Sequence, residues 1–167
     1  ELATYDHDGT YTELETGKYM YKFGTVLPAD YDMDVTHTLG MFARRDLTEF
    51  DLDRYIANEL DHFVPYEMYD PMTRDIDTTE TCNGRCHDQL AMHGGSRQEI
   101  GLCNLCHNPW QEIDPDTGNS VDMPLMTHKI HMGANLENGY AIIGYRQSLH
   151  DYSDVVYPAA VNECESC

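Results

Sequence analysis

Cysteines and histidines lie next to one another at two places in this 167-residue chain. The segment Cys82–His87 has the pattern C-x-x-x-C-H, and Cys103–His107 has the pattern C-x-x-C-H. C-x-x-C-H is the attachment signature of c-type haem, in which two cysteines form thioethers with the porphyrin and the histidine binds the iron. The first motif carries one additional residue between its cysteines, a variant of the same signature. The two motifs predict two haem c groups, with Cys82, Cys86, Cys103 and Cys106 as tethers and His87 and His107 as proximal iron ligands.

A third cysteine pair, Cys164 and Cys167, lies at the end of the sequence with C-x-x-C spacing. In a complete motif the proximal histidine would follow at the next position. We therefore predict a third haem at this pair, and we expect the chain to be a truncated or cleaved piece of a longer protein.

The first four cysteines also suit a different site, a structural zinc ion. Sixteen residues separate Cys86 from Cys103, which gives the pattern C-x3-C-x16-C-x2-C of a zinc-ribbon binding module. Zinc does not require a histidine after each pair, whereas haem attachment does. Haem iron also needs a second axial ligand, and further histidines lie nearby, so the histidines favour haem. Disulfides alone would explain none of them.

The distal iron ligands are expected among His93, His128 and His131, the nearest remaining histidines. Two ligands of one iron lie on opposite faces of one porphyrin. His87 and His93, six residues apart, are therefore expected to serve different irons. The same holds for His128 and His131, which lie three residues apart on one helix face. His37, on the apolar face of a predicted strand, is a further candidate, and packing in the core is its alternative.

Two histidines on every iron leave no open coordination position. Such ligation favours electron transfer over the activation of a small molecule, so the sequence predicts an electron-transfer protein and not an enzyme. A multihaem reductase of a small oxyanion or metal ion is the alternative, and it needs at least one iron with an open site.

An acidic turn at residues 114–119 is a candidate calcium site. Carboxylate and amide oxygens are ligands that Ca²⁺ prefers, and a solvated turn without a metal is the alternative. The predicted ligands are Asp114, Asp116 and Asn119.

Composition limits the partners and the compartment. The formal net charge is −20, which argues against nucleic acid and anionic lipid surfaces as partners. No run of 18 apolar residues predicts a transmembrane segment. No signal peptide precedes Glu1, which indicates a mature or partial chain. Haem c is attached outside the cytoplasm, so we expect an extracellular, cell-surface or periplasmic protein.

The elements that must position these residues are expected to be of two kinds. Alternating side chains over 18–23 and 35–43 predict strands, part of a small β-sandwich or barrel. Residues 49–60 are compatible with a helix, although Pro65 and Pro71 interrupt the segment after it. The cysteine-rich remainder predicts short helices, the clearest within 123–138. The fold class is therefore mixed, with a β-rich domain and connection at 1–75 and a multihaem cytochrome domain with little regular structure at 76–167.

Several segments resemble the OmcA/MtrC family of outer-membrane multihaem cytochromes. The specific parts are the H-G-G at 93–95 after the first motif and the H-K-I-H-x-G at 128–133. Further similar segments are Cys103–His107, Val156-Tyr157-Pro158 and, in the β part, Gly9-Thr10-Tyr11, Leu27-Pro28 and Thr36-His37-Thr38.

The resemblance implies β-barrel-like domains that alternate with multihaem domains. It implies electron transfer at the cell exterior to minerals, flavins or other cytochromes, and copies of the chain in an assembly or filament as partners. It also implies His93, His128 and His131 as distal ligands. The widened first motif and the small number of motifs depart from the decahaem pattern.

Overall fold

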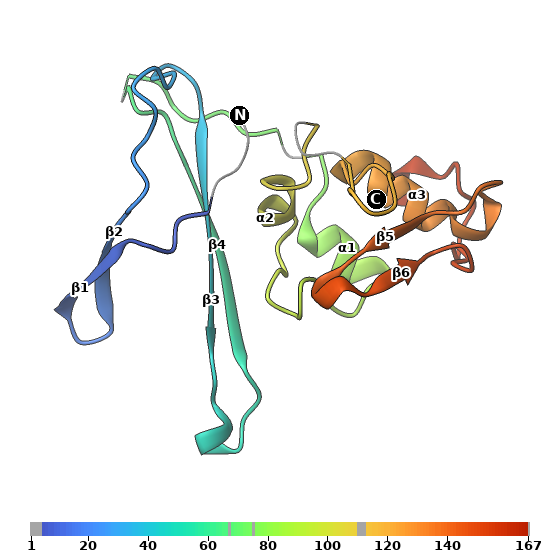
Figure 1. The fold of residues 1–167 in the computed structure, drawn as a ribbon, viewed down its shortest axis with the longest axis horizontal. Coiled ribbons are helices and arrows are strands. Elements are labelled where there is room, and N and C mark those ends of the chain that lie inside the picture. Colours follow the sequence, from blue (N-terminus) through green and yellow to red (C-terminus); the bar gives the residue numbers. More distant parts are fainter. Residues whose placement is uncertain (1–4, 67, 75, 110–112, 167) are drawn as a thin grey trace.

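Hairpins are the main elements of the first half of the chain, and the second half contains short helices joined by irregular segments (Figure 1). The computed structural model describes residues 5–66, 68–74, 76–109 and 113–166. The strands are β1 (Thr10–Glu15), β2 (Lys18–Lys22), β3 (His37–Arg45), β4 (Tyr55–Phe63), β5 (Ala141–Ile143) and β6 (Leu149–Asp151). The helices are α1 (Thr79–Arg85), α2 (Ile100–Asn104) and α3 (Met123–Met132), with single 3₁₀ turns η1 (Thr48–Phe50), η2 (Gly133–Asn135), η3 (Tyr145–Gln147) and η4 (Cys164–Ser166).

The β3–β4 hairpin is the longest regular element. Its strands pair in antiparallel register from His37 opposite Phe63 to Arg45 opposite Tyr55, and η1 lies at its tip. The strand expected over 35–43 is therefore confirmed. The helix considered for residues 49–60 is wrong, because the side chains of β4 alternate strictly between exposed and half-buried positions. That alternation is the period of a strand with one covered face.

The β1–β2 hairpin is a separate two-stranded sheet. The Asp6 carboxylate holds the end of β2, since it accepts hydrogen bonds from the Tyr21 hydroxyl and from the backbone N–H groups of Gly24 and Thr25. The expected mixture of small sheets followed by short helices is confirmed. Among the described residues, however, each of the three sheets has two strands, and they form no closed barrel.

The C-terminal part surrounds Tyr140, which is 2% exposed. Its hydroxyl donates to the carbonyl of Ser120, its ring stacks on Tyr152, and burial raises its pKa to about 12. The helix expected within 123–138 is confirmed as α3. The β5–β6 hairpin, which was not predicted, packs on the same side of the molecule (Figure 1).

A close contact joins the β3–β4 hairpin to α2. A methyl group added at Gly40 would collide with Leu102 and Leu105, and one at Gly101 would collide with Leu60. The two backbones approach closely only because both positions lack a side chain. The hydrophobic side chains buried in the described part of the chain are Val64, Ile100, Leu102 and Tyr140.

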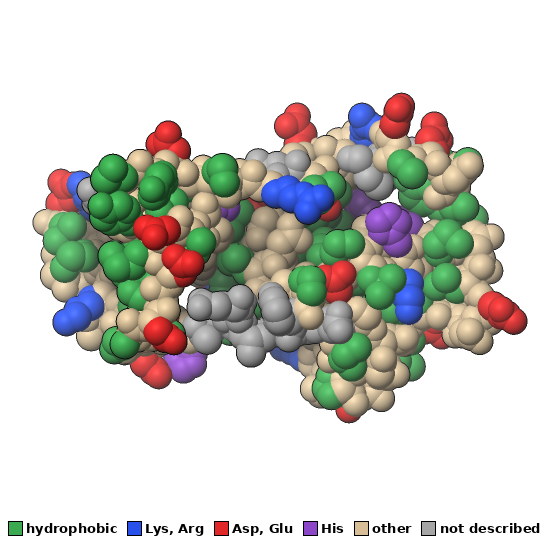
Figure 2. Space-filling view, turned by 90° about the horizontal axis from the view of Figure 1, so that it is seen from above, with side chains coloured by type: hydrophobic (Ala, Val, Ile, Leu, Met, Phe, Trp, Pro, Cys, Tyr) green, Lys and Arg blue, Asp and Glu red, His purple; other side chains and the backbone are tan. Residues whose placement is uncertain are grey.

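Acidic side chains are spread over the molecular surface. Figure 2 shows them scattered over one face among hydrophobic side chains, without a single acidic patch. None of the described helices is long and apolar enough to cross a membrane. The domain boundary expected between residues 75 and 76 falls at residue 75, which lies outside the described residues, and it stays a prediction.

Candidate functional site

The first motif begins in α1 and ends in a wide turn. Thr78 caps the helix, because its hydroxyl accepts the N–H of Thr81. The carbonyl of Cys82 then accepts the N–H groups of both Cys86 and His87, at 3.3 and 3.0 Å. The bond from His87 spans five residues, as in a π-type turn, so the additional residue of the motif is absorbed within one turn.

The second motif forms the corresponding turn at ordinary helical spacing. The carbonyl of Cys103, in α2, accepts the N–H of His107 at 2.9 Å, a bond that spans four residues. In both motifs the histidine N–H thus returns to the carbonyl of the first cysteine. The two turns bring two thiols and one imidazole onto a short stretch of backbone, as covalent haem attachment requires.

Thr79 joins the two cysteine-bearing helices. Its hydroxyl oxygen accepts the N–H of Ile100 and donates to the carboxylate of Glu99, both at 2.8 Å. One threonine at the start of α1 thereby fixes the start of α2.

Three of the candidate ligands have the same ring orientation. His107 Nδ1 donates to the carbonyl of Val121, His128 Nδ1 to that of Pro124, and His131 Nδ1 to that of Thr127. A carbonyl can only accept, so Nδ1 carries the proton and Nε2 of the neutral ring keeps its lone pair. This is the tautomer that a metal ligand binding through Nε2 needs.

The structure brings the candidate ligands together in two pairs. The rings of His87 and His131 have their centres 6.1 Å apart, and those of His93 and His107 are 5.9 Å apart. Each pair contains one histidine from a cysteine motif and one from elsewhere. Neither His87 with His93 nor His128 with His131 forms such a pair.

These separations match two ligands of one metal. A metal–imidazole bond is about 2.0 Å long and the ring centre lies about 1.1 Å beyond the nitrogen, so opposed ligands have ring centres about 6 Å apart. The ring spacing in each pair is therefore that of two imidazoles on one metal, with interplanar angles of 61° and 34°. The two members of each pair already lie next to each other, so no change in secondary structure or strand register is needed to bring them together.

The pKa values near the second motif favour neutral groups. Partial burial, together with nearby His107 and Arg97, lowers the pKa of His93, which favours the neutral imidazole that binds metals. Burial, and then the Glu99 carboxylate, raise the pKa of the Cys103 thiol.

The zinc site considered from the cysteine spacing is not formed. Within the described parts of the chain, no group of three or more His, Cys, Asp or Glu side chains is arranged to hold a metal ion. All four cysteines of the zinc pattern belong to those parts. The zinc-ribbon alternative therefore lacks its site.

The acidic turn is tied to the backbone around it. The buried Asp114 carboxylate accepts the N–H groups of Ile143, Asp116 and Thr117, and Asn119 donates its amide to the carbonyl of Ala141. The hydrogen bond from Ile143, followed by those from Asp116 and Thr117, lowers the pKa of Asp114. Calcium binding by Asp114, Asp116 and Asn119 stays a prediction.

The remaining candidates lie apart from the two pairs. His37 packs between the rings of Tyr31 and Phe63, and its Nε2 donates to the carbonyl of Asp32. His128 is exposed on α3. Cys164 is exposed as well, and its predicted partner Cys167 lies outside the described residues.

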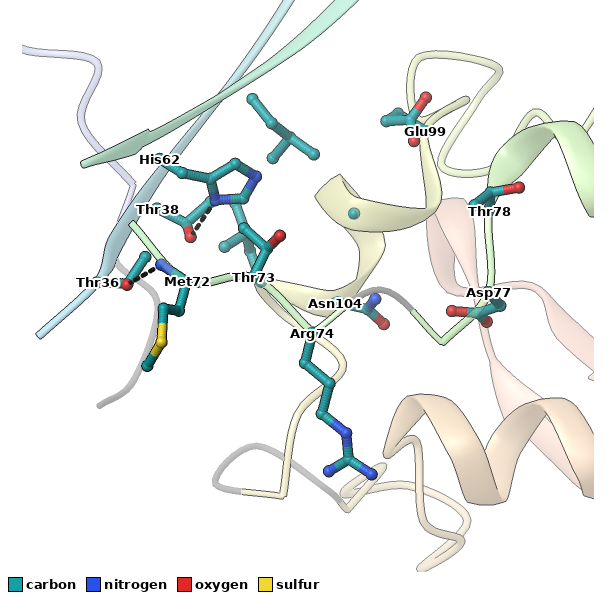
Figure 3. A pocket seen from close by; sticks show the side chains of 13 residues that line it. Thr36, Thr38, His62, Met72, Thr73, Arg74, Asp77, Thr78, Glu99 and Asn104 are labelled. Atoms are coloured by element: carbon teal, nitrogen blue, oxygen red, sulfur yellow. Dashed lines mark hydrogen bonds between the residues drawn. The ribbon is translucent and has the colours of Figure 1, made fainter. Parts of the chain in front are cut away.

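A cavity of about 470 Å³ lies behind the second motif, between the β3–β4 hairpin and α2 (Figure 3). Thr38 and His62, which share a hydrogen bond, line it on one side, and Asn104 and Leu105 line it on the other. The cavity separates part of the hairpin from the residues between the two cysteines of the second motif.

The sequence analysis missed the residues that connect the hairpin to His93. Asn58 in β4 hydrogen bonds to the backbone at Ser96 and Gln98, and the Arg97 guanidinium lies over the ring of Phe42. The available signal was an asparagine on the half-buried face of a strand, between Ile56 and Leu60. That signal could be used only after 55–63 had been recognised as a strand.

Comparisons with known proteins found similar outer membrane cytochromes. Residues 74–167 match the family model described as outer membrane cytochrome MtrC/MtrF-like, domains II/IV. The chain is also similar to the crystal structure of the outer membrane decaheme cytochrome OmcA, with 27% sequence identity and a TM-score of 0.75. That match covers 94% of this chain and 25% of the OmcA chain, so the sequence spans about a quarter of that protein. No curated protein sequence matches.

Proposed function

Because this chain belongs to the MtrC/MtrF-like family of outer membrane cytochromes, we propose that it conducts electrons through c-type haems whose irons are each held by two histidines. The family predicted from the sequence is confirmed, and its members are proteins of the outer membrane and cell exterior. The number of haems, their ligands and the acceptor are the finer parts of the proposal.

The observation that carries the proposal is the pairing of histidine rings. We assign His87 and His131 to one iron, tethered through Cys82 and Cys86. We assign His107 and His93 to a second iron, tethered through Cys103 and Cys106. Ring-centre separations of 6.1 and 5.9 Å support both assignments.

The protein residues have distinct tasks in this arrangement. Haem, when bound, supplies an iron that takes up and releases single electrons. The backbone carbonyls of Val121 and Thr127 hold the protons on Nδ1 of His107 and His131, which directs Nε2 toward the metal. Ligands on both sides leave no position for a substrate, so the chain acts as a conductor and not as an enzyme.

A third haem at Cys164 and Cys167 extends the proposal. His128 faces solvent on α3, three residues before His131, and can serve an iron other than the one assigned to His131. Arg85 links this end of the chain to the first motif, because its guanidinium donates to the carbonyl of Glu165. Neighbouring cytochromes and extracellular acceptors are the proposed partners.

The pyridine haemochrome spectrum and intact mass of the secreted protein test the proposal. We expect a c-type band and a mass that exceeds the 19.1 kDa chain by two or three haems. A colourless protein at the bare chain mass would refute the proposed function. Substituting Cys164→Ala should remove one haem only if the terminal pair is a tether.

Ligand assignment is tested by carbon monoxide binding to the reduced protein. In the wild type, the two irons assigned to these histidine pairs should bind none, because each has two ligands. His131→Ala should open one site, at the haem of Cys82 and Cys86. Carbon monoxide binding at either of these two irons in the wild type would favour the reductase alternative, and a silent His131→Ala variant would contradict the first pairing.

A further inference from the structure

The loop that carries His93 has an unusual backbone. His93, Gly94 and Gly95 all have positive φ values, of 51°, 72° and 84°. Glycine adopts such values readily, whereas a residue with a Cβ atom does so only when its surroundings impose them. The loop is closed by hydrogen bonds between the backbones of Met92 and Arg97. Contacts from the β3–β4 hairpin add to this closure.

Asn58 supplies two of the external contacts. Its side-chain nitrogen donates to the carbonyl of Ser96 at 3.1 Å, and its side-chain oxygen accepts the N–H of Gln98 at 2.9 Å. A single side chain of β4 thus hydrogen bonds to the residues on both sides of Arg97. Such a pairing fixes the distance and the register between strand and loop.

Arg97, which closes the loop, makes three further contacts. The centre of its guanidinium lies 3.3 Å from the ring centroid of Phe42, which is a close cation–π contact. One guanidinium nitrogen donates to the hydroxyl of Tyr5, and another donates to that of Ser96. The buried Ser96 hydroxyl in turn donates to the carbonyl of His93 at 3.1 Å. Arg97 therefore acts on His93 itself through one serine.

The contacts made by Asn58 and Phe42 come from one pair of opposite residues in the hairpin. Phe42 and Asn58 are directly opposite each other in the β3–β4 register, so their side chains lie on the same face. The contact between Leu60 and Gly101, two residues further along β4, fixes the same face against α2, which carries Cys103. One strand thereby holds both the tether and the opposed histidine of the second motif.

We propose that the β3–β4 hairpin is a positioning element for the second haem, in which Asn58, Phe42 and Arg97 hold the His93 imidazole opposite His107. This inference rests on the proposed role of His93 as an iron ligand. Asn58, Phe42 and Arg97 are positioning residues, since they act on the iron only through His93. The hairpin thus sets the ligand geometry of one haem and leaves the pair His87 and His131 independent.

The test compares Asn58→Ala with Glu59→Ala in the haem-loaded full chain. Glu59 is exposed on the opposite face of the same strand, which makes it a matched control. We expect Asn58→Ala to keep its haem content, since the thioethers remain. The equilibrium for release of His93 should shift by about tenfold to hundredfold, equivalent to about 1.4–2.8 kcal/mol. The readouts are the low-spin g-values and high-spin fraction in electron paramagnetic resonance, and carbon monoxide uptake at one haem.

A second pair of variants protects the test against loss of folding. Phe42→Ala removes the surface under Arg97 and should change the same signal, whereas Phe42→Tyr keeps an aromatic ring and should restore it. Unchanged spectra in both Asn58→Ala and Phe42→Ala would overturn the inference, and so would an equal change in Glu59→Ala.

His93→Ala separates this inference from the proposed function. If His93→Ala leaves the spectra unchanged, His93 is not a ligand and the assignment of the second iron fails. If His93→Ala opens the site but the hairpin variants do not, the ligand assignment stands and only the positioning role fails.

Discussion

The two cysteine–histidine motifs have nearly the same backbone turn but very different surroundings. The first lies at the surface: α1 has no buried residue, and Cys86 and His87 are exposed. The second is half-buried: α2 buries Ile100 and Leu102, and His107 is hydrogen bonded through both its ring and its carbonyl. The two motifs therefore share the turn that haem attachment requires, while burial and hydrogen bonding are concentrated on the second motif.

This difference indicates a division of roles between the two proposed haems. Burial and hydrogen bonding around the ligands are among the properties that set the potential of a haem. The surface motif suits exchange of electrons with a partner. The more enclosed motif suits conduction inside the chain, since β4 contacts both the helix that carries Cys103 and the loop that carries His93.

The largest effect should come from replacing the proximal histidines. We expect His107→Ala to lower the free energy of unfolding by about 1–3 kcal/mol more than His87→Ala, because only His107 loses a partly buried ring hydrogen bond. Each variant should lose the low-spin signal of one haem. Denaturant unfolding measures the difference, with the exposed His7→Ala as control. An equal loss of unfolding free energy in the two histidine variants would contradict the difference between the two motifs.

Two glycines provide the next test, because each attachment helix contains one: Gly84 lies near the end of α1 and Gly101 near the start of α2. Alanine at Gly101 would collide with Leu60, so we expect a destabilisation of about 1–3 kcal/mol. Alanine at Gly84 meets open space within α1 and should stabilise by up to about 1 kcal/mol through helix propensity. Chemical denaturation of both variants measures the change in the free energy of unfolding. A change of the same sign in both variants would mean that the packing around the two motifs does not differ.

The smallest effect concerns pH and the turn that follows the second motif. The pKa of Asp114 is lowered in the folded chain, so its stabilising contribution is present above its unfolded pKa of 3.8. The contribution is lost as the pH falls through the lowered folded pKa. Asp114→Asn should cost on the order of 1 kcal/mol at neutral pH. The difference from the wild type should shrink in acid, whereas exposed Asp116→Asn should show no such pH dependence.

Local spacing predicted the parts of this molecule that depend on neighbouring residues. The two attachment turns, strand β3 and helix α3 follow from patterns within short windows of the sequence. Strand β4 was harder to predict, because residues 49–60 satisfy a helical pattern as well. Its partner β3 decides in favour of the strand by offering a continuous register.

The pairing of ligands could not be predicted, because it depends on the packing of distant segments. His131 reaches His87 from α3, and His93 reaches His107 from a loop with left-handed backbone. The sequence excluded two pairings but left the others open. The support from Asn58 depends on strand register, which a single sequence does not encode locally.

The shared carbonyl of Cys82 affects how such sites are counted. Its bond from the His87 N–H spans five residues, whereas the bond from the His107 N–H to the Cys103 carbonyl spans four, so one inserted residue lengthens the turn without moving the histidine away from the first cysteine. A strict search for C-x-x-C-H would find one complete motif in this chain, whereas the backbone forms two such turns. Wherever the first cysteine carbonyl can close a longer ring, this motif tolerates insertion, and inventories of electron-carrying centres based on fixed spacing will be too small.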